Sequence, residues 1–299
     1  MPSGEIAALG AAFLWALATV VYGHFGKSLS PLILNLVKGI IAIAFITLTL
    51  ALQTNLQPEL PGTAVVWLLL SGAIGIGLGD TAYFTALNAL GARQTLLMES
   101  LAPPLTALLA LLFLQEQLSI IAWMGVFLTP LGVTWVISER VPAPNGIQIQ
   151  PWRGVMWALL AELAQATGAV ISRGALADTV VDPLWSGLLR IVAGVVVLIG
   201  LVLAPGWGQR QVGAQLQQLR SHRLLPWIAL AAFLGTYLAI WLQQVSLKYA
   251  PAGIAQALLA TSPLFVLPVA AMMGDRVSWR ATLGVLVAIG GVWLLISSS

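Results

Sequence analysis

The sequence has no cysteine and very few charged residues among its 299 positions. Without cysteine the chain forms no disulfide, no iron–sulfur cluster and no thiolate metal site. Charged residues make up 8% of the chain, against about 25% in soluble domains, whereas apolar residues make up 59%. So few charges cannot cover a surface that faces water, which excludes a soluble enzyme and a disordered scaffold. The composition therefore predicts an integral membrane protein.

Signals for nucleic-acid binding and for catalysis are also missing. The formal net charge is only +3 and the basic residues are scattered, so there is no clustered patch for a phosphate backbone. The chain contains no H-E-x-x-H, G-x-S-x-G or Walker motif, and these motifs are what metal-assisted, nucleophilic and nucleotide chemistry require. We expect no enzymatic activity, no catalytic residues, no metal, no cofactor and no nucleic-acid partner.

Long apolar runs are what the sequence has instead. A membrane-spanning helix needs roughly 20 mostly apolar residues. Runs bounded by proline, glycine and charged residues predict ten such spans, at 5–25, 32–52, 64–88, 93–114, 118–137, 152–173, 183–204, 225–247, 252–272 and 278–297. The stretch 205–224 is compatible with either a short helix in the membrane interface or a plain loop.

Lysine and arginine are distributed unequally between the two sides of the predicted membrane. The loops after spans 1, 3, 5, 7 and 9 hold nine basic residues, and the opposite loops hold two, Arg173 and Lys248. We call the first side the basic side. Positively charged loops face the cytoplasm, so both termini are predicted to be non-cytoplasmic. The nine residues are Lys27, Arg93, Arg140, Arg153, Arg210, Arg220, Arg223, Arg276 and Arg280.

The two halves of the chain repeat each other. Spans 2 and 7 each open with Pro-Leu and carry a cation seven residues after the proline, at Lys38 and Arg190. Further pairs follow at offsets of 160 and 159: Trp67 with Trp227, Pro103 with Pro263, Glu116 with Asp275, Gly125 with Gly284 and Gly132 with Gly291. Five spans are an odd number, so the second half is inverted relative to the first. The predicted fold class is an all-α membrane protein of ten transmembrane helices in two inverted five-helix repeats, 1–140 and 152–299, joined by a linker at 141–151.

Several segments resemble EamA-type carriers of the drug/metabolite transporter superfamily. They are the paired Pro-x₆-Lys/Arg openings, the segment DTAYFTALNALGARQTLLMESLAPPLTALLALLFLQE with its LGAR turn and P…E run, and the second copy KYAPAGIAQALLATSPLFVLPVAAMMGD. The resemblance covers nearly the whole chain. It implies a five-plus-five fold and a carrier that exports amino acids, metabolites or drugs. These carriers are often drawn with cytoplasmic termini, whereas the charge distribution here predicts the reverse.

Five ionisable residues fall inside the predicted spans, where each is costly unless paired or hydrated. They are Lys38, Asp80, Glu99, Glu162 and Arg190. Three acids outnumber two bases, so one carboxyl is left to hold a proton, which either couples transport to protons or forms a neutral hydrogen bond. Lys38, Asp80 and Glu99 all lie roughly 9–12 Å inside the basic side, which predicts a buried cluster with Asp80 paired to Lys38 and Glu99 as the proton holder. For Arg190 three partners are open: Glu162, a substrate carboxylate, or carbonyl groups freed by Pro263.

Polar residues at helical spacing indicate inward faces of four spans. Such a face either lines a cavity or contacts neighbouring helices, and both readings are open. Prolines inside spans mark either a hinge at the site or a structural kink. The cavity candidates are Trp15, Thr19, Tyr22, Thr95, Glu99, Glu162, Gln165, Arg190, Tyr237, Trp241 and Gln244, and the helix breaks are Pro103, Pro104 and Pro263.

These features together predict a secondary transporter in the plasma (inner) membrane. We expect it to move small organic metabolites, such as amino acids or amphipathic compounds, outward by alternating access, with protons as a candidate partner and the lipid bilayer as its surroundings. A sugar-phosphate or nucleotide-sugar carrier is an alternative, although it would need several inward cations and only Lys38 and Arg190 are available. A lipid-handling or scaffold protein is the alternative from another class.

Overall fold

A computed structural model describes residues 3–25, 29–53, 60–90, 92–139, 151–204, 224–266 and 279–298, and every regular element in these ranges is helical. Eight helical stretches in the described residues are long and apolar enough to cross a membrane, and two shorter apolar stretches, Leu97–Phe113 and Ala252–Val266, accompany them. The predicted all-α membrane fold with about ten spans is therefore confirmed.

The first half contains five spans, of which the third and fourth are interrupted. The third changes from α-helix to π-helix and back, and the fourth breaks at residues 100 and 101 just before Pro103. The elements are α1 (Ser3–Phe25), α2 (Pro31–Leu52), α3 (Gly62–Gly72), the π-helix η2 (Ala73–Gly79), α4 (Asp80–Leu90), α5 (Ala92–Glu99), α6 (Ala102–Phe113) and α7 (Ile120–Glu139).

The second half has the same plan. Its eighth span also changes to a π-helix midway, and its ninth breaks at residues 260 and 261, just before Pro263. The elements are α8 (Pro151–Leu176), α9 (Pro183–Leu203), α11 (Leu225–Ala232), η3 (Phe233–Leu238), α12 (Ala239–Tyr249), α13 (Ala252–Leu259), a short helical stretch at 262–266 and α15 (Trp279–Ser297). Residues 205–223, most of the linker at 141–151 and Asp275 lie outside the described residues, so the choice between an interfacial helix and a loop at 205–224 stays open.

The equivalent spans α2 and α9 begin in the same way. Before each proline stands a capping residue in an extended conformation. The Oγ of Ser30 accepts a hydrogen bond from the backbone N–H of Ile33, and the carboxylate of Asp182 accepts from the N–H groups of Leu184 and Trp185. Such caps satisfy N–H groups that have no partner within the helix, and proline fits the first turn because it lacks an N–H. The shared start therefore follows from the repeated sequence.

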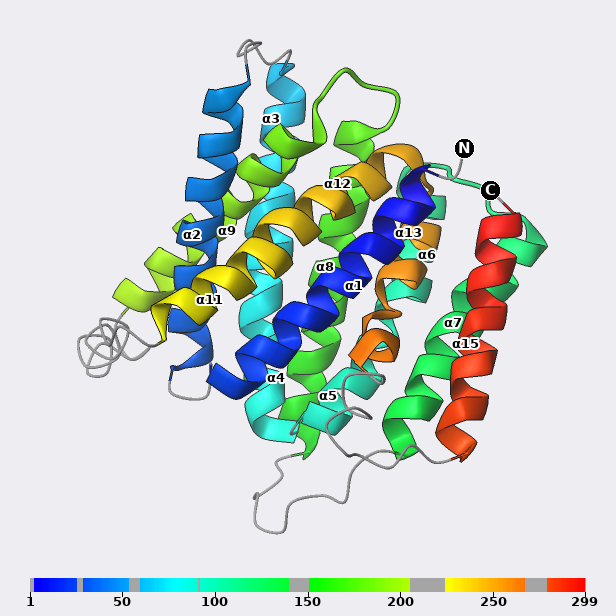
Figure 1. The fold of residues 1–299 in the computed structure, drawn as a ribbon. Coiled ribbons are helices and arrows are strands. Elements are labelled where there is room, and N and C mark those ends of the chain that lie inside the picture. Colours follow the sequence, from blue (N-terminus) through cyan, green and yellow to red (C-terminus); the bar gives the residue numbers. More distant parts are fainter. Residues whose placement is uncertain are drawn as a thin grey trace.

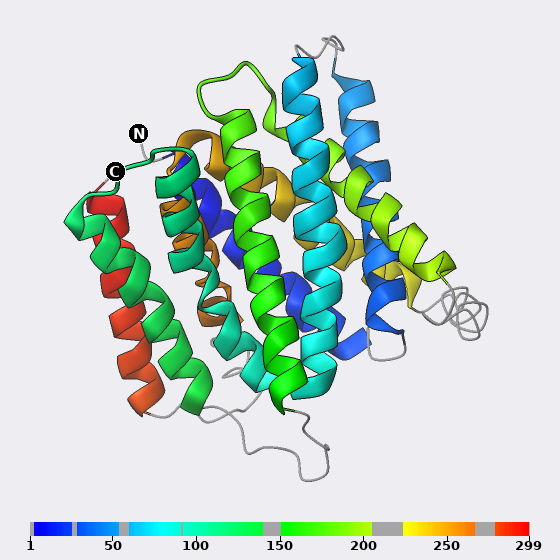
Figure 2. The same cartoon turned by 180° about the vertical axis from the view of Figure 1, so that it is seen from behind.

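The halves pack against each other in equivalent pairs. Helix α1 of the first half packs on α12 of the second, and its counterpart α8 of the second half packs on α4 of the first. Helix α2 likewise packs on α9, and α6 packs on α13. Helices α7 and α15 form the most extensive pair and lie side by side at one edge of the bundle in both views (Figures 1 and 2). The N and C marks lie at the same end of the helix bundle (Figure 1). An even number of spans requires this, because it returns the chain to the side of the membrane on which it began.

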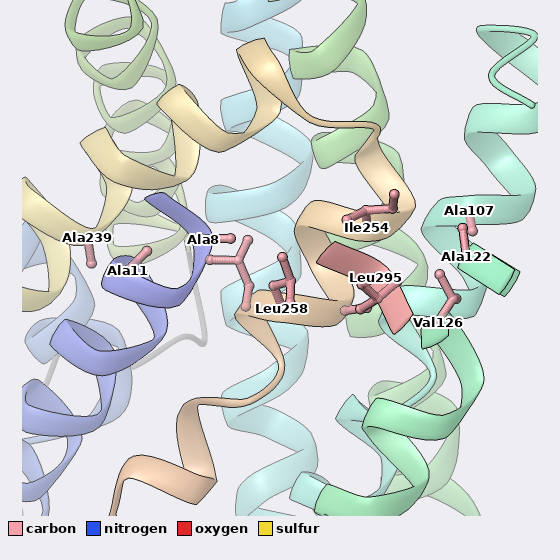
Figure 3. Packing of buried hydrophobic residues seen from close by; sticks show 11 residues of the cluster. Ala8, Ala11, Ala107, Ala122, Val126, Ala239, Ile254, Leu258 and Leu295 are labelled. Carbon is pink, nitrogen blue, oxygen red and sulfur yellow. The ribbon is translucent and has the colours of Figure 1, made fainter. Parts of the chain in front are cut away.

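Small residues dominate the largest apolar cluster. Ala8, Ala11 and Ala239 are buried where α1 packs on α12, and Ala107 is buried where α6 packs on α13, which carries Ile254 and Leu258 (Figure 3). Small side chains let membrane helices approach closely, which strengthens their van der Waals packing. Most of this cluster lies in the half of the bundle away from the basic side, so that half is densely packed.

Candidate functional site

A cavity of about 970 Å³ lies between the two halves. A cavity of this size can hold a small organic molecule. All five ionisable residues predicted inside the spans line it: Lys38, Asp80, Glu99, Glu162 and Arg190. Because these residues come from five different spans, neither half forms the cavity alone.

The cavity extends from the middle of the bundle toward the basic side. Its lining includes Leu90, which ends α4, and Leu198, which lies near the end of α9. The other end of the cavity is formed by Arg190 and by the glutamines Gln165, Gln243 and Gln256. Beyond that end lies an apolar cluster of buried residues, so the cavity is closed on the side opposite the basic loops; the cluster includes Leu176, Val181, Leu247 and Ala252.

Lys38 and Asp80 form an ion pair on the cavity wall. The Lys38 Nζ lies 3.6 Å from the Asp80 Oδ2, and both side chains are about one fifth exposed. The Lys38 Nζ also lies 5.9 Å from the centre of the Phe84 ring. Asp80 is the first residue of α4, directly after the π-helix η2. The structure thus brings together the two residues that their equal depth predicted to meet.

Glu99 and Glu162 line the same cavity without an ion pair in the part of the chain that the structure describes. The Glu99 side chain is exposed to the cavity, whereas Glu162 is 2% exposed and its Oε2 has no hydrogen-bond partner. Asp80 and Tyr83 line the same cavity. Three carboxyl groups therefore face one cavity.

Arg190 is buried at the closed end of the cavity with few partners. Its Nη1 donates a hydrogen bond of 3.4 Å to the Oε1 of Gln243, and its Nε has no partner. The described residues provide neither an ion pair with Glu162 nor a hydrogen bond to a carbonyl near Pro263. Burying a guanidinium with unused donors is costly, so this position suits an anionic group of a ligand.

The backbone of Arg190 is fixed by a close helix contact. A Cβ atom at Gly72 would clash with the Cα, the carbonyl carbon and the carbonyl oxygen of Arg190. Only glycine therefore allows α3 to lie this close to α9. One turn further along, the Arg190 Nη2 and the Gln165 Oε1 both lie over Gly75, 3.5 and 3.7 Å from the position of a Cβ there. The guanidinium and the Gln165 amide therefore both lie against the glycine-rich surface of the third span.

Most of the other predicted cavity residues on the first and sixth spans also line the cavity. Trp15 and Thr19 do so from α1, and the Trp15 Nε1 donates a 2.7 Å hydrogen bond to the carbonyl of Gly235 in η3. Gln165 lines it from α8, and the helix breaks contribute Pro103 and Pro263. Pro104 lies in the first turn of α6 but does not line the cavity.

Five predicted cavity residues lie elsewhere: Tyr22, Thr95, Tyr237, Trp241 and Gln244. The Tyr237 hydroxyl is 2.8 Å from the Thr49 hydroxyl, and the ring stacks on Phe45. The Gln244 Oε1 accepts hydrogen bonds from the hydroxyls of Ser172 and Ser186. Trp241 is partly exposed at the surface and Thr95 is fully buried. The polar face of the eighth span therefore mainly binds neighbouring helices.

Seven polar cavity residues escaped the sequence reasoning: Asn35, Tyr83, Ser100, Thr236, Gln243, Gln256 and Ser262. Asn35 is 1% exposed, and neither its amide nitrogen nor its amide oxygen has a partner. It precedes Lys38 by three residues and so shares its helix face, which is a signal that the sequence contains. Gln243 directly precedes the predicted Gln244, and sequence alone does not show which of two adjacent glutamines faces the cavity.

Comparison with known proteins identifies the family. The model of the EamA-like transporter family matches residues 2–138 and 152–297. The chain belongs to this family. An uncharacterized transporter in the cobO 3′ region of a Sinorhizobium species is 30% identical to it over 123 residues, which are 40% of this chain and 85% of the relative. A solved crystal structure of a protein, 16% identical, matches with a TM-score of 0.75 over 98% of this chain and 96% of its own, which shows the fold.

Membership in the EamA-like transporter family confirms the resemblance seen in the sequence. The chain is a multi-pass membrane transporter of the drug/metabolite transporter superfamily, and its substrate is a small molecule. The cavity between the halves is large enough to hold such a molecule.

Proposed function

We propose that this transporter exports small organic metabolites that carry a carboxylate group, amino acids among them, across the plasma (inner) membrane by alternating access of its two halves. The observation that carries the proposal is Arg190, a buried cation at the closed end of the cavity with unused donors and no carboxylate partner among the described residues. A substrate carboxylate can accept two parallel hydrogen bonds from a guanidinium.

The charges around Arg190 favour a zwitterionic substrate. Glu99 and Glu162 line the cavity without ion pairs in the described ranges, and they offer acceptors for an ammonium group. Trp15 adds an aromatic wall for an apolar part of the ligand. Outward transport comes from the family resemblance, and the distribution of basic loop residues supports termini that are non-cytoplasmic.

Protons are the second proposed partner. Lys38 and Asp80 neutralise each other, which leaves Glu99, Glu162 and Arg190 as the remaining charged residues of the cavity lining. Two acids facing one base favour one protonated carboxyl, because like charges at short distance disfavour double ionisation. We assign the proton to Glu99, which is exposed to the cavity and lies directly before the break in the fourth span.

A sugar-phosphate or nucleotide-sugar carrier fits the cavity less well. A phosphate with two negative charges calls for several cations, and of the two cations in the lining, Lys38 is already paired with Asp80. A lipid-handling or scaffold protein would not need the charged cavity between the halves. Flux of solute in proteoliposomes separates a carrier from a lipid-handling or scaffold protein, and the chemical class of the transported solute separates the two kinds of carrier.

The test is a thermal-shift screen on the purified protein, since a ligand that binds the native state raises its melting temperature. Amino acids and other carboxylates are compared with their amides, and active compounds are then tested for flux. We expect Arg190→Gln to abolish stabilisation by the carboxylates while the melting temperature without ligand changes little. Arg153→Gln, which removes an exposed arginine at the start of α8, is the control. Equal stabilisation by acids and amides in the unaltered protein would contradict the proposal.

A further inference from the structure

A second polar cluster lies outside the cavity, on the side opposite the basic loops. Its centre is an ion pair in which the Arg173 Nε donates to the Glu116 Oε1 at 2.6 Å. The Arg173 Nη1 also donates to the carbonyls of Leu247 and Lys248, at 3.0 and 2.7 Å. The other carboxylate oxygen, Glu116 Oε2, accepts from the backbone N–H of Ala252 at 2.9 Å. We call these five residues the latch.

The latch joins the two halves of the chain. Glu116 belongs to the connection between α6 and α7 in the first half, and Gln115 before it adopts a positive φ of 56° that ends α6. Its partners belong to the second half: Arg173 lies in the last turn of α8, and the others lie at the junction of α12 and α13. A single carboxylate of one half thus holds two separate parts of the other half together.

Neighbouring contacts reinforce the same closed end. The Lys248 Nζ donates a 2.7 Å hydrogen bond to the carbonyl of Val181, which ties α12 to the connection between α8 and α9. Leu176 and Val181 are fully buried beside the latch, in one apolar cluster with Leu247 and Ala252 of the latch itself. The latch residues do not line the cavity. The latch is therefore joined to the apolar layer that closes the cavity on this side.

We propose that the latch keeps the transporter closed on the side opposite the basic loops and opens once in each transport cycle. This inference rests on the alternating access proposed above. For the end of the cavity at Arg190 to reach the opposite side, the α12–α13 junction and the end of α8 must move away from the α6–α7 connection, and the bonds of Glu116 span that gap. The two charged side chains are 14% and 16% exposed, so water reaches them readily when the bonds break.

The test uses a single reporter cysteine, because the chain has no cysteine of its own. Ser262→Cys changes one atom in a residue that lines the cavity near the break in the ninth span. A membrane-impermeant maleimide is added from one side or the other of oriented vesicles, and the labelling rate is measured. With the latch intact, we expect labelling to be faster from the basic side.

Breaking the latch should move the balance between the two states. In the Ser262→Cys background, Glu116→Gln keeps an oxygen that can accept from Ala252 but removes the charge, and Arg173→Gln removes the other partner. We expect each to raise the labelling rate from the side opposite the basic loops about tenfold, which corresponds to about 1.4 kcal/mol. Arg153→Gln, at the other end of α8 and exposed, is the matched control and should leave both rates unchanged. Unchanged rates in both latch variants would overturn the proposal.

A second measurement covers the case in which a latch variant fails to fold. Cysteines introduced together at Leu114 and Gly174, which contact each other across the two halves beside the latch, leave Glu116 and Arg173 in place. After folding and purification they are bridged with a short bis-methanethiosulfonate, which forms a disulfide with each thiol, releases methanesulfinate and is cleaved by a reducing agent. We expect the bridge to stop flux and its cleavage to restore flux, and full flux in the bridged protein would overturn the latch. Flux through the unaltered protein with no effect of the bridge rejects the latch alone, whereas absence of flux for every tested solute in the unaltered protein rejects the proposed function instead.

Discussion

At the scale of single residues, the cavity combines one satisfied charge pair with three charged groups that have few partners. Lys38 and Asp80 bind each other, while Arg190 and Glu162 each retain an atom without a hydrogen bond. A buried polar atom without a partner costs about 1–3 kcal/mol. A binding site can carry this cost when the ligand supplies the missing partner, which agrees with a cavity whose ligand is charged at both ends.

Lys38 is expected to be important for stability. Lys38→Ala leaves the Asp80 carboxylate without its cation inside the membrane, so we expect the free energy of unfolding to fall by roughly 2–4 kcal/mol, near the lower end for broken buried ion pairs because both side chains are partly exposed. The melting temperature in detergent measures the effect. The double variant Lys38→Met/Asp80→Asn should recover much of the loss, and a double variant as unstable as Lys38→Ala would contradict the pairing.

Glu99 is expected to matter for transport and little for folding. Its side chain faces the cavity and forms no ion pair among the described residues, so Glu99→Gln should shift the melting temperature by only a few degrees at most. Glu99 shares the cavity with the ionisable residues Lys38, Asp80, Tyr83, Glu162 and Arg190. If Glu99 among them carries the coupled proton, the same change should remove the pH dependence of flux. The flux is measured in proteoliposomes between pH 5 and 8, and a pH profile that matches the unaltered protein would count against this role.

At the scale of helices, the sequence showed where the spans lie better than which way they face. Span positions follow from the lengths of apolar runs and from prolines, and the breaks before Pro103 and Pro263 appear where those prolines predict them. In the eighth span the cavity is lined by Thr236, Ile240 and Gln243, each one position before the predicted Tyr237, Trp241 and Gln244. A shift of one residue turns a helix face by about 100°.

This difference has a physical cause that sequence alone cannot show. The predicted stripe is polar because Tyr237 and Gln244 form hydrogen bonds to Thr49, Ser172 and Ser186 on neighbouring helices. A hydrogen bond across a helix interface and a contact with a hydrated cavity select the same residue types. Polar spacing therefore locates the inward half of a helix, and its partners decide which residues reach the cavity.

Two adjacent glycines of α15 give a matched test of the pair α7–α15. A Cβ at Gly291 would lie 2.9 Å from the Cα of Thr129 and closer still to its amide nitrogen and hydroxyl, whereas a Cβ at Gly290 would have no neighbour within 4 Å. We expect Gly291→Ala to lower the free energy of unfolding by about 1–3 kcal/mol through overpacking. Gly290→Ala should be neutral or raise it by up to about 1 kcal/mol, because alanine favours the helix. Equal melting temperatures for the two variants would contradict the packing.

At the scale of the whole molecule, orientation is the property that packing leaves open, since inverted halves look alike from either side. The termini share one edge of the bundle (Figure 1), so one reporter fixes the orientation of both. We expect a reporter fused after Ser299 to be non-cytoplasmic, because the nine basic loop residues lie on the other side. A fluorescent protein that folds only in the cytoplasm should stay dark at this position, and a bright fusion would reverse the assigned sidedness.

The π-helical segments bear on how the protein arose. A π-helical turn forms when a helix accommodates one additional residue, and such turns are rare. Here η2 begins at Ala73 and η3 at Phe233, and the offset between them is the one that relates Trp67 to Trp227. One insertion in an ancestral five-helix chain, followed by duplication and fusion of its gene, accounts for both segments at once. The two segments, AIGIGLG and FLGTYL, share only one glycine and one leucine at equivalent positions, so the halves repeat the shape of the backbone at their centres where the side chains differ.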